Sequence, residues 1–433
     1  MKRKIIQYLL WVLAKLTLWR YHPLIIAVSG STGKSSTKEA IYYALKNNFR
    51  VKRSFSNLNT EIGVPLTIIQ GYDAKTNIFL WLANIFKTFG LLIIKQKDYP
   101  EILILEMSED QPGLIDYLTN LCRPKIGVIS WISDLPVHAE FYPNAQALHQ
   151  EIQKLVLKLP KDGTAILNSD NDLSLEIKDK IKSQLLTYGF SEKAEVKISD
   201  YSLVVSQDLR ETGMSFRLEY QGSYVPVKFK GVFGEAQAYA LAAGAAVGLA
   251  LGLNLIEIAQ SLEDYTILKA RTTFLKGKKN TWLLDDSYNS NPTALKMALK
   301  IFSEVVNSLK QENLYPVKRR ILALGEMREL GKYSEEAHRE IASYLIKEAE
   351  ILILVGEKMK ITYEECLKLG FSQENIYWFN NSKDAAKKAQ ELIQAGDLFL
   401  VKGSRGIHLE QVTLAIMQEP EKAKNYLSFE EPT

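Results

Sequence analysis

Apolar runs of strand length alternate with helix-like segments along the first part of the chain. The run "PLIIAVSG" (residues 23–30) precedes "KSSTKEAIYYALKNN" (34–48), whose apolar residues recur at helical spacing. The runs "EILILEMS" (101–108) and "KIGVISWI" (125–132) continue the series, and a helical stretch from Asn144 to Leu159 follows. Alternation of this kind is typical of a parallel sheet covered by helices.

The pattern changes twice further along the chain. From about Thr164 to Lys230, period-two segments such as "SFRLEY" (215–220) predict an antiparallel β portion, before an Ala-rich helix at 235–252. After "DYTILKAR" (264–271) strands and helices alternate again, with one helix around Ser334 to Ala349. The sequence therefore predicts an α/β fold with a central domain (24–265), whose sheet is mostly parallel, and a C-terminal α/β domain (266–433).

Two apolar helical stretches stand apart from this alternation. Residues 1–23 begin with basic residues, but no signal-peptide cleavage site follows, and the run is shorter than the roughly 20 apolar residues that cross a bilayer. On a helical wheel the polar residues share one narrow side and the apolar ones a broad arc: Lys4, Gln7 and Lys15 against Ile5, Leu9, Leu13, Leu16 and Trp19. An insertion at about 76–95 is similar. Both stretches are expected either to dock on the protein's own core or to contact a membrane surface.

The composition fits an ordinary globular protein of two or three domains. Of 433 residues, 46% are hydrophobic and 24% charged, and the net charge of +4 is too small and dispersed for a nucleic-acid footprint, which leaves small molecules as the expected partners. The two cysteines, Cys122 and Cys366, lie far apart without metal-ligand spacing. A reducing, cytoplasmic location and a monomer are expected.

The turn after the first strand, "SGSTGKSS" (29–36), has the chemistry of a phosphate loop. Backbone N–H groups at a strand-to-helix turn cradle phosphate oxygens, a lysine reaches the β- and γ-phosphates, and a hydroxyl takes Mg²⁺. These roles fall to Gly30, Ser31, Thr32, Gly33, Lys34, Ser35 and Ser36. Val28 stands where the usual P-loop pattern has its first glycine. This departure weakens the assignment to the P-loop class more than it weakens the prediction of phosphate binding. The central domain is therefore expected to be a P-loop-type ATPase domain using ATP and Mg²⁺.

Six stretches together resemble the Mur ligases, in the family's order from Ser29 to Val412. They are "SGSTGKSSTKEAI", "SNLNTEIGVPLTI", "LEMSEDQPGLIDYLTNLCRPKIGVIS", "DDSYNSNPTALKMAL", "ALGEMRELGKYSEEAHREI" and "VKGSRGIHLEQV". The likeness is greatest to the branch that adds D-alanyl-D-alanine to UDP-N-acetylmuramoyl-tripeptide. It implies an amide ligase that phosphorylates a carboxylate with ATP and lets an amine attack the acyl phosphate, and it implies a Rossmann-like C-terminal domain.

The resemblance also implies roles for particular residues. Glu106 matches the magnesium-binding glutamate, His138 a second metal-site histidine, and Arg271 the arginine that meets the γ-phosphate when the C-terminal domain closes. The other matches are nucleotide contacts at Asp286, Tyr288, Asn289 and Asn291, a pocket for the carboxylate substrate at Asn57, Asn59, Thr60 and Glu61, and a region for the amino substrate at Lys402, Ser404 and Arg405. Glu326 and His338 fall in matching motifs without an assigned role.

Three departures from the family pattern keep alternatives open. The family carries a domain for the uridine nucleotide before the phosphate loop, whereas here the loop begins at Ser29, so another surface or a lipid-linked or simpler donor is expected. Ile152 stands where the family has a carbamylated lysine, which Glu151 or Lys154 would have to replace. Glu235 and Ala236 replace a His-Asn pair that contacts the nucleotide. The rival interpretations are an amide ligase for a folate-like or polyglutamyl substrate and an inactive ATP-binding scaffold at the membrane.

Overall fold

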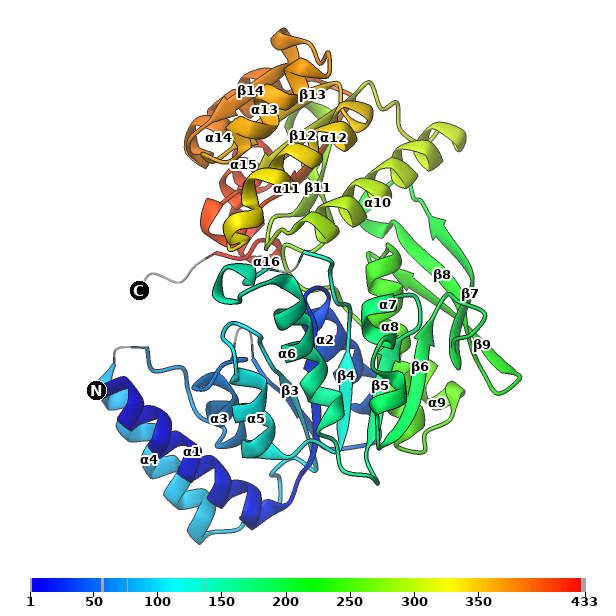
Figure 1. The fold of residues 1–433 in the computed structure, drawn as a ribbon. Coiled ribbons are helices and arrows are strands. Elements are labelled where there is room, and N and C mark those ends of the chain that lie inside the picture. Colours follow the sequence, from blue (N-terminus) through cyan, green and yellow to red (C-terminus); the bar gives the residue numbers. More distant parts are fainter. Residues whose placement is uncertain (1, 56–57, 76, 136, 430–433) are drawn as a thin grey trace.

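The structure, a computed structural model, describes residues 2–55, 58–75, 77–135 and 137–429. It has two lobes, each built around one sheet (Figure 1). The sheet of the first lobe has nine strands in the order β2 (Val51–Arg53), β3 (Ile102–Glu106), β1 (Leu24–Ser29), β4 (Ile126–Ile129), β5 (Thr164–Asn168), β6 (Gln184–Gly189), β7 (Val196–Val204), β8 (Gly213–Tyr220) and β9 (Ser223–Lys230).

Most strands of this sheet run parallel, as the alternating pattern predicts. Parallel pairing extends from β2 through β7, and antiparallel pairing joins β7 to β8 and β8 to β9. The predicted antiparallel portion is therefore wrong for β5 and β6. β5 is buried, whereas β6 is exposed at Gln184 and half-buried at Leu185 and Thr187, and the residues of neither strand show in which direction its neighbour runs.

Helices cover both faces of the central strands of the first sheet, and the residues of β1, β3, β4 and β5 are accordingly almost all buried. Ile26 and Val28 of β1 pack in the core with Ala40 and Ile41, whereas Ile25 and Ala27, on the opposite face of the same strand, belong to a second core. The first core involves α2 (Lys34–Leu45), α8 (Glu235–Ala250) and α9 (Leu255–Leu262). The other face is covered by α1 (Lys2–Tyr21), α3 (Gly63–Ile68), α4 (Ile78–Ile93), α5 (Leu114–Cys122) and α6 (Ala145–Leu157), and α7 (Asp172–Leu175) follows β5.

The second lobe is a six-stranded sheet in the order β10 (Thr273–Gly277), β11 (Thr281–Asp286), β15 (Asp397–Lys402), β12 (Arg319–Gly325), β13 (Ile351–Val355) and β14 (Ile376–Phe379). Adjacent strands of this sheet are parallel, except that β10 pairs antiparallel with β11. β10 is an edge strand that the sequence did not predict. Its helices are α10 (Pro292–Gln311), α11 (Ser334–Glu340), α12 (Ala342–Glu348), α13 (Met359–Lys368), α14 (Ser382–Leu392), α15 (Glu410–Ile416) and α16 (Ala423–Tyr426). The expected helix around residues 334–349 is thus two helices that meet at Ile341.

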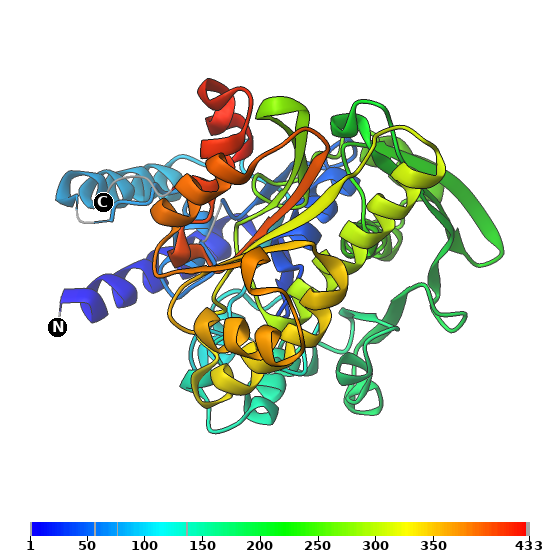
Figure 2. The same cartoon turned by 90° about the horizontal axis from the view of Figure 1, so that it is seen from above.

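The two lobes meet where several of their parallel strands end (Figures 1 and 2). The side-chain amide of Asn291, at the start of α10, donates to the Thr32 hydroxyl in the turn after β1, with 3.0 Å between the two atoms. Lys332 of the second lobe donates to the carbonyl oxygen of Pro143 in the first. Since ligands of α/β sheets bind at the carboxyl ends of the strands, a ligand site is expected at this junction.

Candidate active site

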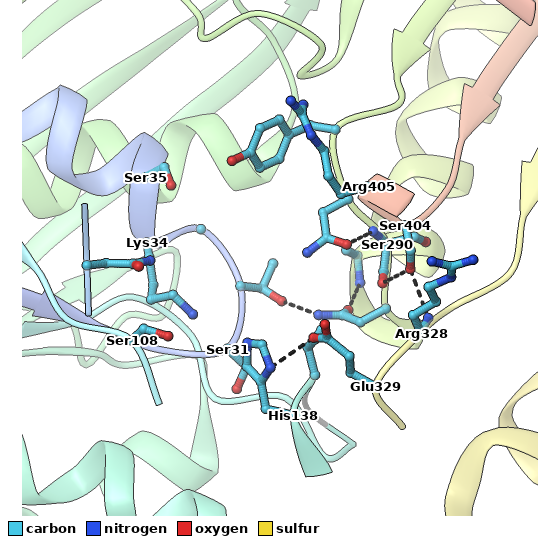
Figure 3. Close-up of a pocket in the computed structure, with 18 of the residues that line it drawn as sticks. Ser31, Lys34, Ser35, Ser108, His138, Ser290, Arg328, Glu329, Ser404 and Arg405 are labelled. Carbon is cyan, nitrogen blue, oxygen red and sulfur yellow. Dashed lines mark hydrogen bonds and ion pairs between the residues drawn. The ribbon is translucent and has the colours of Figure 1, made fainter. Parts of the chain in front are cut away.

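A cavity of about 460 Å³ lies between the lobes, and most of the predicted site residues line it (Figure 3). Figure 3 shows Lys34 and Ser35 on one side and Ser404 and Arg405 facing them from the other lobe. The predicted residues on its wall are Ser31, Thr32, Gly33, Lys34, Ser35, Ser36, Asn59, Glu106, His138, Arg271, Tyr288, Asn289, Asn291, Ser404 and Arg405. The fold therefore brings segments from residues 31 to 405 together in one place.

In the turn from β1 into α2, the backbone lies close to Ser130 and Trp131. A Cβ atom on Gly30 would lie 2.3 Å from the Ser130 hydroxyl oxygen, so only glycine fits there, and Gly33 precedes α2 with a positive φ of 84°. Ser31 and Thr32 both donate their backbone N–H to the carbonyl oxygen of Trp131. The N–H groups that remain for a phosphate are therefore those of the first turn of α2, and their phosphate-binding role stays a prediction.

Lys34 is held by a carboxylate that our sequence analysis did not single out. Its ammonium group lies 2.8 Å from one carboxylate oxygen of Glu109 and 2.6 Å from the carbonyl oxygen of Gly30. The Glu109 side chain is fully buried. Burial lowers the pKa of Lys34, but the carboxylates of Glu109, Glu106 and Asp110 together raise it by more, so the net shift of this pKa is upward and the lysine stays charged.

Glu106 ends β3 directly beside the phosphate loop, as the sequence predicted. Its carboxylate accepts hydrogen bonds from the Ser35 hydroxyl and the Asn59 side chain, both at 3.2 Å, and pairs with Lys38. Burial raises the pKa of Glu106, but Lys38 and Lys34 lower it by more, so its net pKa lies below the ordinary value.

The oxygen atoms of Ser35 and Glu106 are ligands of the kind that Mg²⁺ prefers. The Ser35 hydroxyl oxygen and one Glu106 carboxylate oxygen lie 3.2 Å apart, and the second carboxylate oxygen of Glu106 is buried 3.2 Å from the Lys38 ammonium group. These residues therefore fit the expected magnesium ion. No cluster of three or more His, Cys, Asp or Glu side chains suited to a metal occurs among the described residues, so a further metal site gains no support.

His138 lies between two carboxylates rather than facing the phosphate loop with a free nitrogen. One ring nitrogen is 3.0 Å from Asp110 and the other 2.9 Å from Glu329 of the second lobe. Burial lowers the pKa of His138, but the two carboxylates raise it to about 9. A protonated imidazole has no lone pair for a metal, so the geometry favours an ion pair between the lobes, and the metal-ligand role stays a prediction.

The His138 ion pairs predict a pH dependence of stability. The folded pKa of about 9 lies above the unfolded value of about 6.5, so the stabilisation is complete below pH 6.5 and is lost as pH rises through about 9. We expect the unfolding free energy of wild type to fall by about 1–3 kcal/mol more than that of His138→Gln between pH 6.5 and 10. Urea unfolding at both pH values measures this difference. An equal pH dependence in the two proteins would show that the ion pairs contribute nothing.

The second lobe contributes an aromatic ring between two guanidinium groups. The Arg271 guanidinium carbon lies 4.2 Å from the centre of the Tyr288 ring, and that of Arg405 lies 5.1 Å from it. Asn291 caps α10 by accepting the N–H of Ala294, and its amide also donates to Thr32, so helix capping and a place at the site occur together. This wall offers cations and a flat apolar surface opposite the phosphate loop.

Two predicted residues pair with each other just outside this cavity. The Lys402 ammonium lies 2.6 Å from the Asp286 carboxylate, and both side chains are buried. They line a smaller hollow of about 90 Å³, which adjoins the phosphate loop at Gly33 and is also lined by Arg271 and Glu235. The nucleotide role of Asp286 and the substrate role of Lys402 stay predictions.

The predicted substrate loop divides between the main cavity and a neighbouring one. Glu61 accepts a hydrogen bond from Gln7 of α1 and lines a second cavity of about 560 Å³ between α1 and the start of α5. Thr60 accepts from the N–H of Gly63 at 3.5 Å, near the start of α3. Asn57 lies outside the described residues. The carboxylate-pocket role thus has geometric support at Asn59 and stays a prediction for Thr60 and Glu61.

The two candidates for replacing the carbamylated lysine do not line the main cavity. Glu151 accepts the N–H of Ile115 at the start of α5 and pairs with Lys154, which also pairs with Asp116. Ile152 is buried in the core. Glu151 and Lys154 thus have structural partners at the start of α5, and their replacement of the carbamylated lysine stays a prediction.

Glu326 and His338 have structural partners as well. His338 is buried, accepts the N–H of Met327 and donates to the carbonyl oxygen of Ser334, and its pKa is lowered chiefly by burial. Glu326 accepts a hydrogen bond from the N–H of Lys358. Neither lines the cavity, and both hold the loop after β12 in place.

The sequence analysis missed four charged residues on or beside the cavity wall. Glu109 and Asp110 directly follow the predicted strand that ends at Glu106, and Arg328 and Glu329 belong to the quoted stretch "ALGEMREL". Each of them follows closely after the carboxyl end of a strand, and this position marks a residue as a candidate for the site. The partners of Glu109 and Glu329, namely Lys34 and His138, lie far away in the sequence.

Comparisons with known proteins agree with this arrangement. Residues 88–248 match the family model of the Mur ligase middle domain, and residues 270–405 match the Mur ligase, glutamate ligase domain. The chain is 26% identical over 408 residues to UDP-N-acetylmuramoyl-tripeptide–D-alanyl-D-alanine ligase of Bacillus subtilis, covering 94% of this chain and 79% of that protein. It is 25% identical to the ligase of the same name from Escherichia coli, covering 91% of this chain and 77% of that protein.

Solved structures show the same fold. The crystal structure of MurF from Acinetobacter baumannii superposes with a TM-score of 0.76 at 21% identity, over 94% of this chain and 79% of that one. MurF from Thermotoga maritima in complex with ADP gives a TM-score of 0.73 at 23% identity, over 96% and 84%. With both domains matched in order over more than half of its length, this chain belongs to the Mur ligase family.

Proposed function

We propose that this protein is an ATP-dependent, ADP-forming amide ligase of peptidoglycan precursor synthesis. It joins D-alanyl-D-alanine or a similar amino substrate to a muramoyl-peptide-type carboxylate. The observation that carries the proposal is the cavity between the lobes, where the phosphate loop faces arginines of the second lobe. The names of its relatives in Bacillus subtilis and Escherichia coli support the choice of substrates.

The cavity supplies the charges that this chemistry needs. A donor carboxylate oxygen attacks the γ-phosphorus of ATP, the bond to the β-phosphate oxygen breaks, and ADP leaves. Lys34 and Arg271 neutralise the negative charge that gathers between the two anions, and both line the cavity. Magnesium, held by Ser35 and Glu106, would add further positive charge at the phosphates.

The second step forms the amide bond. The amine nitrogen attacks the acyl carbon, and the tetrahedral intermediate expels phosphate while the nitrogen loses a proton. Arg405 and Ser404 lie on the wall supplied by the second lobe, where we place the amino substrate. Holding three substrates together removes roughly 7–11 kcal/mol of the barrier in favourable cases, so both lobes are needed for turnover.

The remainder of the donor has a candidate place beside the main cavity. Asn59 and Asp110 line the main cavity, whereas Glu61 and Gln111, one or two residues further along each loop, line the second cavity of about 560 Å³. Trp11 and Tyr117 add aromatic surface to this second cavity. A donor whose carboxylate reaches Glu106 would therefore extend under α1.

The reaction predicts a specific product. With ATP, D-alanyl-D-alanine and UDP-N-acetylmuramoyl-tripeptide, we expect ADP release only when both substrates are present, and a product whose mass is the sum of both minus water. Mass spectrometry and an ADP assay measure this. Parallel reactions with a lipid-linked muramoyl peptide and with a folate or polyglutamyl acid identify the donor. ADP release with the folate-type acid alone, or no substrate-dependent release at all, would favour one of the rival interpretations.

The proposed setting is the cytoplasm, where ATP is available. None of the helices formed by described residues is long and apolar enough to cross a bilayer. Peripheral membrane contact through residues 1–20 and 78–95 is a separate proposal, because it concerns where the enzyme works and not what it catalyses. A monomer remains the expected state.

A further inference from the structure

The exposed apolar side chains of this protein gather on two neighbouring helices, α1 and α4. Of the 21 large hydrophobic side chains that are exposed among the described residues, 13 lie between residues 5 and 94 on or next to these helices. We call this set the apolar face: Ile5, Tyr8, Leu9, Leu16, Trp19, Ile78, Phe79, Leu80, Leu82, Phe86, Phe89, Ile93 and Ile94. A contiguous exposed patch of this kind marks an interaction surface rather than random exposure.

The orientation of α4 is the reverse of that expected for a helix of a protein surrounded by water. Its polar residues Asn84 and Thr88 are buried, and the Asn84 side chain exchanges hydrogen bonds with both backbone groups of Tyr72. Phe79, Phe86 and Ile93, by contrast, are each more than 70% exposed. A helix on a water-facing surface turns its apolar stripe inward, so this one is arranged for an apolar environment outside the protein.

Helix α1 shows the same arrangement in a milder form. Leu10, Leu13 and Ala14 pack into the core, and two of its polar side chains bond to the protein, Gln7 to Glu61 and Lys15 to the carbonyl oxygen of Asn120. The expected core docking of α1 is thus real, yet it leaves its other apolar side free. The Tyr21 hydroxyl donates to the carbonyl oxygen of Leu91 and fixes α1 against α4. Figures 1 and 2 both show the two helices on the side of the molecule away from β7, β8 and β9.

The charges around the apolar face indicate which occupant fits it. Neither α1 nor α4 contains an Asp or Glu. Lys4 is exposed at the start of α1, and just after α4 the exposed Lys95 and Lys97 outnumber the exposed Asp98. A second copy docked face to face would place these cations opposite their own kind, whereas anionic headgroups complement them. Exposed Trp19 and Tyr8 are also of the type that lies at membrane interfaces.

We propose that the apolar face of α1 and α4 docks the protein on the surface of an anionic lipid bilayer. The helices lie in the headgroup region without crossing it, with the aromatic and aliphatic side chains entering the acyl boundary and the lysines contacting headgroups. The apolar face lies outside the main cavity, and of its residues Tyr8 also lines the second cavity. The docking places the second cavity, lined by Tyr8 and Trp11, next to the membrane surface.

Vesicle flotation with the full chain tests this proposal. We expect binding to phosphatidylcholine vesicles that contain phosphatidylglycerol at low salt, and several-fold weaker binding to phosphatidylcholine alone or at high salt. The variant Phe79→Ser, Phe86→Ser and Phe89→Ser removes apolar contact from exposed positions, and we expect at least about tenfold weaker binding. Its thermal unfolding and ADP formation should match wild type.

A matched control removes three exposed apolar side chains elsewhere, with Tyr224→Ser, Ile256→Ser and Leu369→Ser. This control should bind vesicles like wild type. Absence of vesicle binding at low salt, or equal binding by the phenylalanine variant, would overturn the proposal. A wild-type dimer in light scattering that the phenylalanine variant breaks would also overturn it and assign the face to a second copy. Failure of the ligase assay would leave this result unaffected.

Discussion

Lys34→Met, combined with Glu109→Gln, should yield a folded protein in which substrate-dependent ADP formation is reduced by at least about 10³-fold. In the proposed mechanism this lysine is the cation at the γ-phosphate, and loss of a charge that stabilises a transition state commonly has an effect of this size. An ADP-release assay with saturating ATP, donor and amine measures it. Turnover within about tenfold of wild type would contradict the phosphate-loop assignment.

The double variant is needed because Lys34 also has a structural partner. Lys34→Met alone leaves the fully buried Glu109 carboxylate without its cation, and such a loss costs about 3–5 kcal/mol. Inactivity of the single variant could therefore reflect unfolding, whereas Glu109→Gln removes the unpaired charge. Lys46→Met, which breaks the exposed pair with Asp264 at the end of the same helix, is the control, and it should cost less than about 1 kcal/mol and remain active.

Lys402→Met should lower the unfolding free energy by about 3–5 kcal/mol, because it leaves the Asp286 carboxylate buried without a counter-charge. Adding Asp286→Asn should restore most of this loss, since the neutral amide can still accept the N–H of Thr272. Urea unfolding of wild type and the variants gives the three differences. Lys422→Met, at an exposed pair with Glu419, should change stability by no more than about 0.5 kcal/mol.

The Lys402 experiment also separates the two roles this residue could have. A structural ion pair predicts lower stability for Lys402→Met and recovery in the double variant. A contact to the amino substrate predicts unchanged stability and a raised KM for the amine. Unchanged unfolding with a selective loss of amine affinity would therefore favour the substrate role that the family resemblance implies, and it would contradict the stability prediction.

The sequence was sufficient for the α/β class and for the core of the site. The order of strands and helices follows from apolar spacing, and the loop at 30–36 is recognisable because its residues are consecutive. Glu106 could be placed at the site because it ends a strand of the same parallel sheet. The direction of β5 and β6 could not be predicted, since the residues of a strand do not record which neighbours it pairs with.

The local pattern thus determined most of the strands and helices and the loop predicted to bind phosphate, because helical and strand periodicity and the turn chemistry act over a few residues. Only the tertiary structure decided the pairs of Lys34 with Glu109 and of His138 with Glu329, as well as the outward direction of the apolar side of α4. Such pairs join residues far apart in the chain. Whether two distant charges meet, and whether a helix turns its apolar side inward, depends on how whole elements pack together, and this information is absent from any short stretch of sequence.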